Sequence, residues 1–200
     1  MQIVELYYDF GSPNAYLVHK VLPEIAKSHD AALIYKPMLL GGVFKATNNQ
    51  SPMQAFAGVR GKLDYQMKEI DRFIRRYGIS FRMNPHFPIN TLPLMRGAVF
   101  SQEKFWKIEY IDAIFDAIWT AGEKMDDPEV IGRVLTAARL PAAEILAAVS
   151  THEIKEGLIT VTEAAVTRGI FGAPTMFVGD EMFFGKDALS ELEYHLARAS

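Results

Sequence analysis

Residues 3–28 read IVELYYDFGSPNAYLVHKVLPEIAKS, and this stretch decides the fold. Its first six residues form a short, almost continuously apolar run, as a strand covered on both faces requires. The Gly-Ser-Pro that follows interrupts the run, and apolar residues then recur at helical spacing, which predicts a helix over residues 13–28. Residues 31–38 read as a second strand. The chain therefore opens strand–helix–strand, a crossover that normally places the two strands in parallel.

A long helical block follows this opening. Leu63, Met67, Ile70 and Ile74 are spaced as on one face of an amphipathic helix. Three prolines and two asparagines make residues 80–93 irregular. Helical patterns resume at Ile108–Ile118, after Pro128, after Pro141 and over residues 150–168, with each of these two prolines expected in a first helical turn. No strand is expected between about residue 40 and residue 172.

The C-terminal part returns to strands. Residues 172–185 predict a hairpin with Gly179-Asp180 at its turn, and a final helix is expected from Asp187. Removing the helical block leaves a small α/β sandwich. The sequence thus predicts an α/β fold in which residues 1–44 and 169–200 form one domain and residues 45–168 form an inserted helical subdomain.

Composition limits the possible functions. Half of the 200 residues are hydrophobic and 22% are charged, which suits one substantial globular domain. A net charge of −3 argues against a dedicated nucleic-acid binder. The chain contains no cysteine, which excludes disulfides, zinc–thiolate sites and protein-thiol chemistry. Acidic residues come too early for a signal peptide, and no apolar run approaches the roughly 20 residues of a membrane span. We expect a cytoplasmic protein with no membrane partner.

Ser12 is the first candidate functional residue, because it stands where a buried strand gives way to a helix. A serine followed by Pro13 at such a junction is a good N-cap, with its hydroxyl accepting a backbone N–H. The same position also suits chemistry. A helix N-terminus carries a partial positive charge that stabilises an anion such as a thiolate, and a serine hydroxyl can donate to that anion.

The second candidate is Gly172-Ala173-Pro174-Thr175. Proline at the start of a strand is compatible with an ordinary loop-to-strand connection. Alternatively, Ala173–Pro174 is a cis peptide bond, which would leave the backbone groups of Ala173 free to pair with an extended ligand.

These two elements, in this order, resemble the DsbA-like branch of the thioredoxin superfamily, with a helical block inserted into a thioredoxin-like fold. Within that branch the whole chain resembles the 2-hydroxychromene-2-carboxylate isomerases and the kappa-class glutathione transferases. Four motifs carry the resemblance: Asp9-Phe-Gly-Ser-Pro, Lys36-Pro37 with Gly42-Val-Phe-Lys, Asn84-Pro-His-Phe-Pro-Ile-Asn-Thr, and Gly172-Ala-Pro-Thr. Ser12-Pro-Asn-Ala15 replaces the Cys-x-x-Cys of the dithiol oxidoreductases, so disulfide exchange by the protein itself is excluded.

The resemblance implies a glutathione site. It places Ser12 against the sulfur of glutathione, Ala173 with the adjacent Pro174 along the cysteinyl part, and Asn49 on the tripeptide. Lys186 and Asp187 match the pair that holds the γ-glutamyl end, although kappa-class sequences tend to have serine at the first position. From the residues alone, Asp187 reads equally as a cap at a helix start.

The resemblance also implies residues for the substrate, a small aromatic carboxylate. Lys36 ends a strand at the edge where open α/β sheets bind ligands, and isomerases use a basic residue here; its alternative is an edge lysine extended into solvent. Asn84, Pro85 and Phe87 are expected in the lining of the substrate pocket, although they also fit an ordinary loop. The five histidines show no ligand spacing, so no metal site is predicted.

The implied activity is glutathione-dependent cis–trans isomerisation of 2-hydroxychromene-2-carboxylate in naphthalene-type aromatic degradation. Glutathione would add as a thiolate nucleophile to a conjugated carbon, let the resulting single bond rotate, and leave again. Ser12 would keep the thiol ionised, and Lys36 would stabilise the developing enolate. Two alternatives stay open: a kappa-like transferase that conjugates electrophiles, and a non-catalytic glutathione- or peptide-binding protein. Members of the family are usually homodimers.

Overall fold

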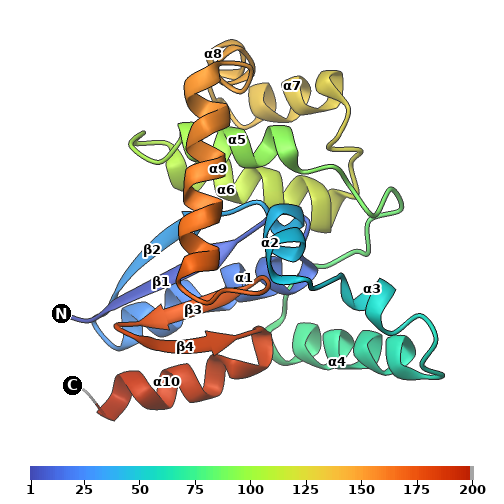
Figure 1. Ribbon diagram of the computed structural model, residues 1–200, viewed down its shortest axis with the longest axis vertical. Helices are drawn as coiled ribbons and strands as arrows, with labels where there is room; N and C mark the ends of the chain where they lie inside the picture. The colour runs from blue at the N-terminus through green and yellow to red at the C-terminus, as the bar shows by residue number, and fades with distance from the viewer. Residues whose placement is uncertain (199–200) are drawn as a thin grey trace.

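A four-stranded sheet lies at the centre of the computed structural model, which describes residues 1–198 (Figure 1). Its order is β2-β1-β3-β4, with β1 parallel to β2 and antiparallel to β3, and with β3 antiparallel to β4. The strands are β1 (Ile3–Tyr8), β2 (Ala32–Pro37), β3 (Thr175–Val178) and β4 (Glu181–Phe184). The predicted parallel opening and the C-terminal hairpin, whose turn is Gly179-Asp180, are both confirmed.

Helices surround this sheet. They are α1 (Pro13–Ser28), α2 (Leu40–Thr47), α3 (Pro52–Ala55), α4 (Lys62–Tyr77), α5 (Leu92–Phe100), α6 (Lys107–Asp116), α7 (Pro128–Ala137), α8 (Ala142–Ala148), α9 (His152–Thr167) and α10 (Leu189–Arg198). A π-helical turn, η1 (Ala117–Ala121), continues α6, and a 3-10 turn, η2 (Lys186–Ala188), precedes α10. The sequence analysis predicted α1, α4, α6, α7 and α9 closely and missed α2, α3 and α5.

Two details of the predicted helices are wrong. Pro141 is the N-cap of α8 and does not lie in its first turn. The last helix begins at Leu189, because Asp187 lies in the 3-10 turn before it.

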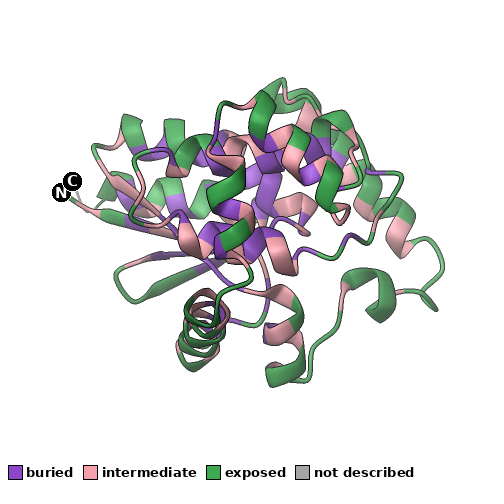
Figure 2. Cartoon of the chain, turned by 90° about the horizontal axis from the view of Figure 1, so that it is seen from above, coloured by how far each residue is buried: buried purple, intermediate pink, exposed green. Residues whose placement is uncertain are grey.

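The two faces of the sheet bury different sets of side chains. Val4, Leu6 and Tyr8 alternate along β1 toward a large core that they share with α1, α5, α6 and α10. The opposite face carries a smaller cluster in which Met38, Val43 and Phe177 pack against residues of the C-terminal end of α9 and the chain after it. Buried residues accordingly concentrate between the sheet and these helices, whereas α3 and the chain around it are exposed (Figure 2).

The helical block is not independent of the sheet. Helix α9 packs along α5 in its upper part, and near its C-terminal end Ala165 joins the cluster on the sheet face (Figure 1). The predicted boundary between residues 44 and 45 falls inside α2, and the boundary between residues 168 and 169 falls just after α9. Among the described residues, no helix has the length and apolar character that a membrane span needs.

Candidate active site

Ser12 caps the helix that follows the first strand. Its backbone is extended, its hydroxyl accepts a hydrogen bond from the N–H of Ala15 at 3.2 Å, and Pro13 occupies the first helical position. The same hydroxyl donates to the carbonyl of Ala173 at 3.0 Å. The first turn of α1 contains no acidic residue that would neutralise the partial positive charge of the helix terminus. Both readings of Ser12 therefore remain compatible: it is an N-cap, and it presents a hydroxyl beside Ala173.

Ala173–Pro174 is a cis peptide bond, as expected from the sequence, and Phe87–Pro88 is a second one that was not foreseen. The carbonyl of Pro174 accepts the N–H of Gly185, which fixes this loop to the end of β4. The Ala173 N–H donates no hydrogen bond to any group among residues 1–198. Ala173 thus offers an unpaired donor and a carbonyl with a second lone pair to an extended ligand.

Asn49 reaches the same loop from the other side. It follows α2, whose end is marked by Asn48 in the left-handed conformation. The Asn49 side-chain amide donates to the carbonyl of Phe171 at 2.8 Å, and its oxygen accepts the N–H of Gln50. The structure therefore brings Asn49 next to the loop that carries Ala173.

Lys186 and Asp187 form an ion pair with each other at the 3-10 turn before α10. The Lys186 side chain is only 5% exposed, and its ammonium lies 5.6 Å from the centre of the Phe73 ring on α4. The Asp187 side chain is 74% exposed. The buried Lys186 ammonium and the exposed Asp187 carboxylate are thus paired within the 3-10 turn that follows β4.

Lys36 takes part in an ion-pair cluster with Glu5 and Arg168 and forms no hydrogen bond with Ser12 among the described residues. Its ammonium pairs with Glu5 at 3.5 Å, and the other oxygen of the Glu5 carboxylate pairs with Arg168. Lys36 stands beside Tyr7 in the parallel register, so Glu5 lies toward the N-terminal end of β1, away from Ser12. Arg168 extends the cluster in the same direction by donating to the carbonyl of Gly179.

Asn84 is buried, and its side-chain amide group and oxygen both form hydrogen bonds with backbone groups. Its amide group donates to the carbonyls of Ile118 and Glu123 at 2.9 Å each, and its oxygen accepts the N–H of His86. Asn84 therefore joins the irregular segment to η1 and to the chain just after it. Pro85 is exposed beside this junction.

We expect Asn84→Ala to lower the free energy of unfolding by about 2 kcal/mol, because it leaves buried backbone groups without partners. The measurement is urea unfolding with an unchanged denaturant slope. Asn90→Ala is the matched control in the same segment, since Asn90 is exposed and, within residues 1–198, its side chain accepts only the N–H of Leu92. Equal losses in the two variants would contradict a clamping role for Asn84.

Phe87 lies close to the Ser12 turn through Trp119. The centres of the Phe87 and Trp119 rings are 5.8 Å apart, and the indole N–H of Trp119 donates to the carbonyl of Phe10 at 2.8 Å. No sequence pattern points to Trp119, because 109 residues separate it from Phe10 in the chain.

Asp9 was also given no role of its own. Its carboxylate is 1% exposed and accepts three hydrogen bonds of 2.8 Å, from the N–H of Gly11, the N–H of Leu40 and the hydroxyl of Thr91. Burial raises the pKa of Asp9, and the three hydrogen bonds offset this rise only in part. One side chain thus connects the Ser12 turn, the start of α2 and the residue before α5.

Asn14 is a further residue that the sequence did not single out. Its side-chain oxygen is buried and accepts no hydrogen bond within the described part of the chain. Asn14 stands two residues beyond Ser12 in the first turn of α1.

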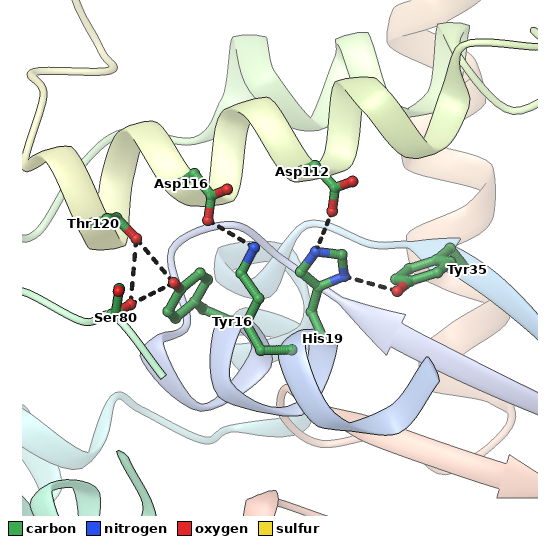
Figure 3. A network of polar contacts seen from close by, with 8 residues as sticks. Tyr16, His19, Tyr35, Ser80, Asp112, Asp116 and Thr120 are labelled. Carbon is green, nitrogen blue, oxygen red and sulfur yellow. Dashed lines mark hydrogen bonds and ion pairs between the residues drawn. The ribbon is translucent and has the colours of Figure 1, made fainter. Parts of the chain in front are cut away.

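A groove of about 730 Å³ lies elsewhere. It is bounded by α1, the end of α4, η1 and α7, and its lining contains none of the predicted site residues. Figure 3 shows the polar network that runs along this region and joins α1 to β2 and to α6. The network consists of Tyr35–His19–Asp112, Lys20–Asp116 and Tyr16–Thr120–Ser80.

The histidine of this network has a defined role. Burial raises the pKa of Tyr35, whose hydroxyl shares a 2.7 Å hydrogen bond with His19 Nδ1, and His19 Nε2 pairs with Asp112 at 2.7 Å. Burial acts to raise the pKa of Asp112, but the hydrogen bond and charge of His19 outweigh it and lower that pKa. All polar atoms of His19 are satisfied, which indicates a structural link between the helical block and the sheet.

Comparison with known proteins gives consistent matches over nearly the whole chain. Residues 3–197 match the model of the DSBA-like thioredoxin domain. The chain is 30% identical over 199 residues to a 2-hydroxychromene-2-carboxylate isomerase of Pseudomonas putida, covering 98% of this chain and 95% of that protein. It is 28% identical over 209 residues to glutathione S-transferase kappa 1 of Rattus norvegicus, covering 98% and 91%. A solved structure of a selenomethionine 2-hydroxychromene-2-carboxylate isomerase matches with a TM-score of 0.87 at 29% identity, covering 98% and 95%.

Proposed function

This chain belongs to the DSBA-like thioredoxin domain family, in the branch that contains the 2-hydroxychromene-2-carboxylate isomerases, and we propose that it is a glutathione-dependent isomerase of 2-hydroxychromene-2-carboxylate. The observation that carries the proposal is the Ser12 hydroxyl, at the N-terminus of α1 and 3.0 Å from the carbonyl of Ala173. A chain without cysteine has no thiol of its own, so the nucleophilic sulfur in this proposal belongs to a bound cofactor.

The residues around Ser12 fit a glutathione molecule. A tripeptide offers amide N–H and carbonyl groups, and the unpaired N–H and the carbonyl of Ala173 can pair with them. The exposed carboxylate of Asp187 suits the α-amino group of the γ-glutamyl end, and the ammonium of Lys186 suits its α-carboxylate. In this proposal the Asn49 amide turns from Phe171 toward the tripeptide, at the mouth of the site.

When bound, glutathione supplies a thiolate that can add reversibly to a conjugated carbon and so permit rotation about a former double bond. The protein's share is to hold that thiol ionised. The N-terminus of α1 contributes its partial positive charge, and the Ser12 hydroxyl contributes a hydrogen bond. Once the Ala173 carbonyl accepts an N–H of the tripeptide, the Ser12 hydroxyl can rotate to donate to sulfur while it still caps Ala15.

The proposal extends to the substrate and the setting. Phe87, with Pro85 next to the buried Asn84, provides the apolar surface for a small aromatic carboxylate. Naphthalene-type degradation and a homodimer follow from the same resemblance. These two points, and the cytoplasmic location expected from the sequence, are part of the proposal.

Lys36 receives no step in this mechanism, because Glu5 already engages its ammonium. We expect Lys36→Gln to leave the turnover number close to that of the unmodified protein and to change stability by no more than about 1 kcal/mol, as for other partly exposed ion pairs. Steady-state kinetics and urea unfolding measure the two quantities. A loss of turnover comparable to that of a Ser12 variant would return Lys36 to the catalytic machinery.

The test of the proposed function follows the absorbance of 2-hydroxychromene-2-carboxylate with the protein, with and without glutathione. We expect conversion to trans-o-hydroxybenzylidenepyruvate only when glutathione is present, with many turnovers for each glutathione molecule. Consumption of one glutathione per product would instead identify a conjugating transferase. Binding of glutathione by calorimetry without any reaction would identify a binding protein.

A further inference from the structure

We propose that Asp9 is a positioning residue for glutathione, because its buried carboxylate holds helix α2 against the Ser12 turn and thereby sets the affinity of the site. This inference rests on the proposed function. It assigns to Asp9 no contact with the cofactor and no proton transfer.

The turn that presents Ser12 is shaped by Asp9 from both its backbone and its side chain. The Asp9 carbonyl accepts the N–H of Ser12 at 3.1 Å, and its Oδ1 accepts the N–H of Gly11 at 2.8 Å. A methyl group at Gly11 would lie 3.3 Å from both Asp9 Oδ1 and Thr91 Cγ2, so the turn is closely packed against this carboxylate. The direction in which Ser12 points therefore depends on Asp9.

The second oxygen of the carboxylate extends this control to the far side of the site. Asp9 Oδ2 accepts the N–H of Leu40, the first residue of α2. Helix α2 leads to Asn49, which bonds the carbonyl of Phe171. That loop continues to Ala173, whose carbonyl accepts the Ser12 hydroxyl. Before glutathione binds, these contacts form a closed ring, and three of the residues proposed to contact glutathione, Ser12, Asn49 and Ala173, belong to it.

The carboxylate is kept at this place although its burial disfavours the ionised form. No lysine, arginine or histidine in the described chain forms an ion pair with Asp9, and the neighbouring Tyr8 hydroxyl keeps its proton because burial raises its pKa. Since the pKa of Asp9 is higher in the folded chain than in the unfolded chain, stability is lost as pH rises through that interval. Ionising the buried group thus costs stability, which favours a role in positioning over a role in folding.

A substitution at Leu40 can remove the hydrogen bond between Asp9 and α2 while Asp9 itself is unchanged. Proline at the first position of a helix is well tolerated, and Leu39 has the extended backbone (φ −86°, ψ 109°) that a residue before proline prefers. Leu40→Pro removes the N–H that Asp9 accepts. Leu40→Ala is the matched control, because it removes the same side chain and keeps that N–H.

The experiment measures glutathione binding by calorimetry and, separately, turnover at saturating glutathione. We expect Leu40→Pro to bind glutathione about 10-fold more weakly than Leu40→Ala, with similar turnover at saturation. Asp9→Asn is the second variant: its amide faces the N–H of Leu40 with a second donor, so it should weaken binding to a similar extent while its urea midpoint stays close to that of the unmodified protein.

The outcomes distinguish failure of the positioning role of Asp9 from failure of the proposed function. If the unmodified protein binds glutathione and isomerises the substrate, but Leu40→Pro and Asp9→Asn bind it as tightly as Leu40→Ala does, the positioning role of Asp9 is wrong and the proposed function stands. If Leu40→Pro does not fold, Asp9→Asn alone decides. If the unmodified protein binds no glutathione, both the proposed function and this inference fall.

Discussion

Gly97→Ala is expected to lower the free energy of unfolding by about 3 kcal/mol, because the added methyl group has no room. Gly97 lies inside α5, and a Cβ atom built on it would stand 2.1 Å from the hydroxyl oxygen of Tyr110 on α6. That hydroxyl is buried and donates to the carbonyl of Leu94 at 2.8 Å. Relieving the clash requires Tyr110 to move, which also breaks this hydrogen bond. The change is measured by urea unfolding.

The control for Gly97→Ala is Gly41→Ala. Gly41 also lies in a helix without a positive φ, and nothing approaches within 4 Å of the position that its Cβ would occupy. Alanine there should raise stability by about 0.5–1 kcal/mol, since it restricts the unfolded chain and favours the helix. A similar change in both variants would contradict the close approach of α5 and α6.

Local pattern was sufficient for the elements that carry their own signals. Helix α1 has an N-cap serine, a proline at the first position and an apolar stripe, and all three are visible in the sequence. The hairpin of β3 and β4 is marked by Gly179-Asp180 between two apolar runs. In such cases the sequence and the tertiary structure favour the same conformation.

The missed helices lack such signals. Helix α2 begins Leu-Gly-Gly with no side-chain cap, and it depends on distant groups: Asp9 accepts the N–H of Leu40, and Thr162 accepts the N–H of Leu39. Helix α5 contains Pro93 and Gly97, and its surroundings bury it from several sides, so it shows no amphipathic period. Tertiary contacts stabilise both helices, and these contacts lie outside any short window of sequence.

The residues of the candidate site also fall into two groups, those marked by a local motif and those whose partners lie far away in the chain. Ser12 was predictable because it stands in a short motif, whereas the cis Ala173–Pro174 bond was expected only through the family resemblance. Asp9 was not predictable, because its donors at Leu40 and Thr91 follow 31 and 82 residues later. The ion pair of Lys36 could have been found from strand alternation. Glu5 and Tyr7 share one face of β1, and the parallel register sets Lys36 beside Tyr7.

Ser12→Ala is expected to reduce turnover at neutral pH by about 10- to 150-fold in the presence of glutathione. A hydrogen bond to a charged group contributes about 1.5–3 kcal/mol, so its loss should raise the pKa of the bound thiol by about one to two units. The loss of turnover should shrink as pH increases, because the thiol then ionises without help from the hydroxyl. Thiolate absorbance in the ultraviolet, recorded against pH beside turnover, measures both effects.

The control separates this chemistry from helix capping. Thr151 caps α9, which has 16 residues like α1, through the same kind of hydroxyl-to-N–H bond. Thr151→Ala and Ser12→Ala should each lower stability by about 1 kcal/mol through the lost cap. Only Ser12→Ala should move the thiol pKa and the pH dependence of turnover. An unchanged thiol pKa in Ser12→Ala would mean that Ser12 acts as a cap alone, and that the N-terminus of α1 activates the sulfur without it.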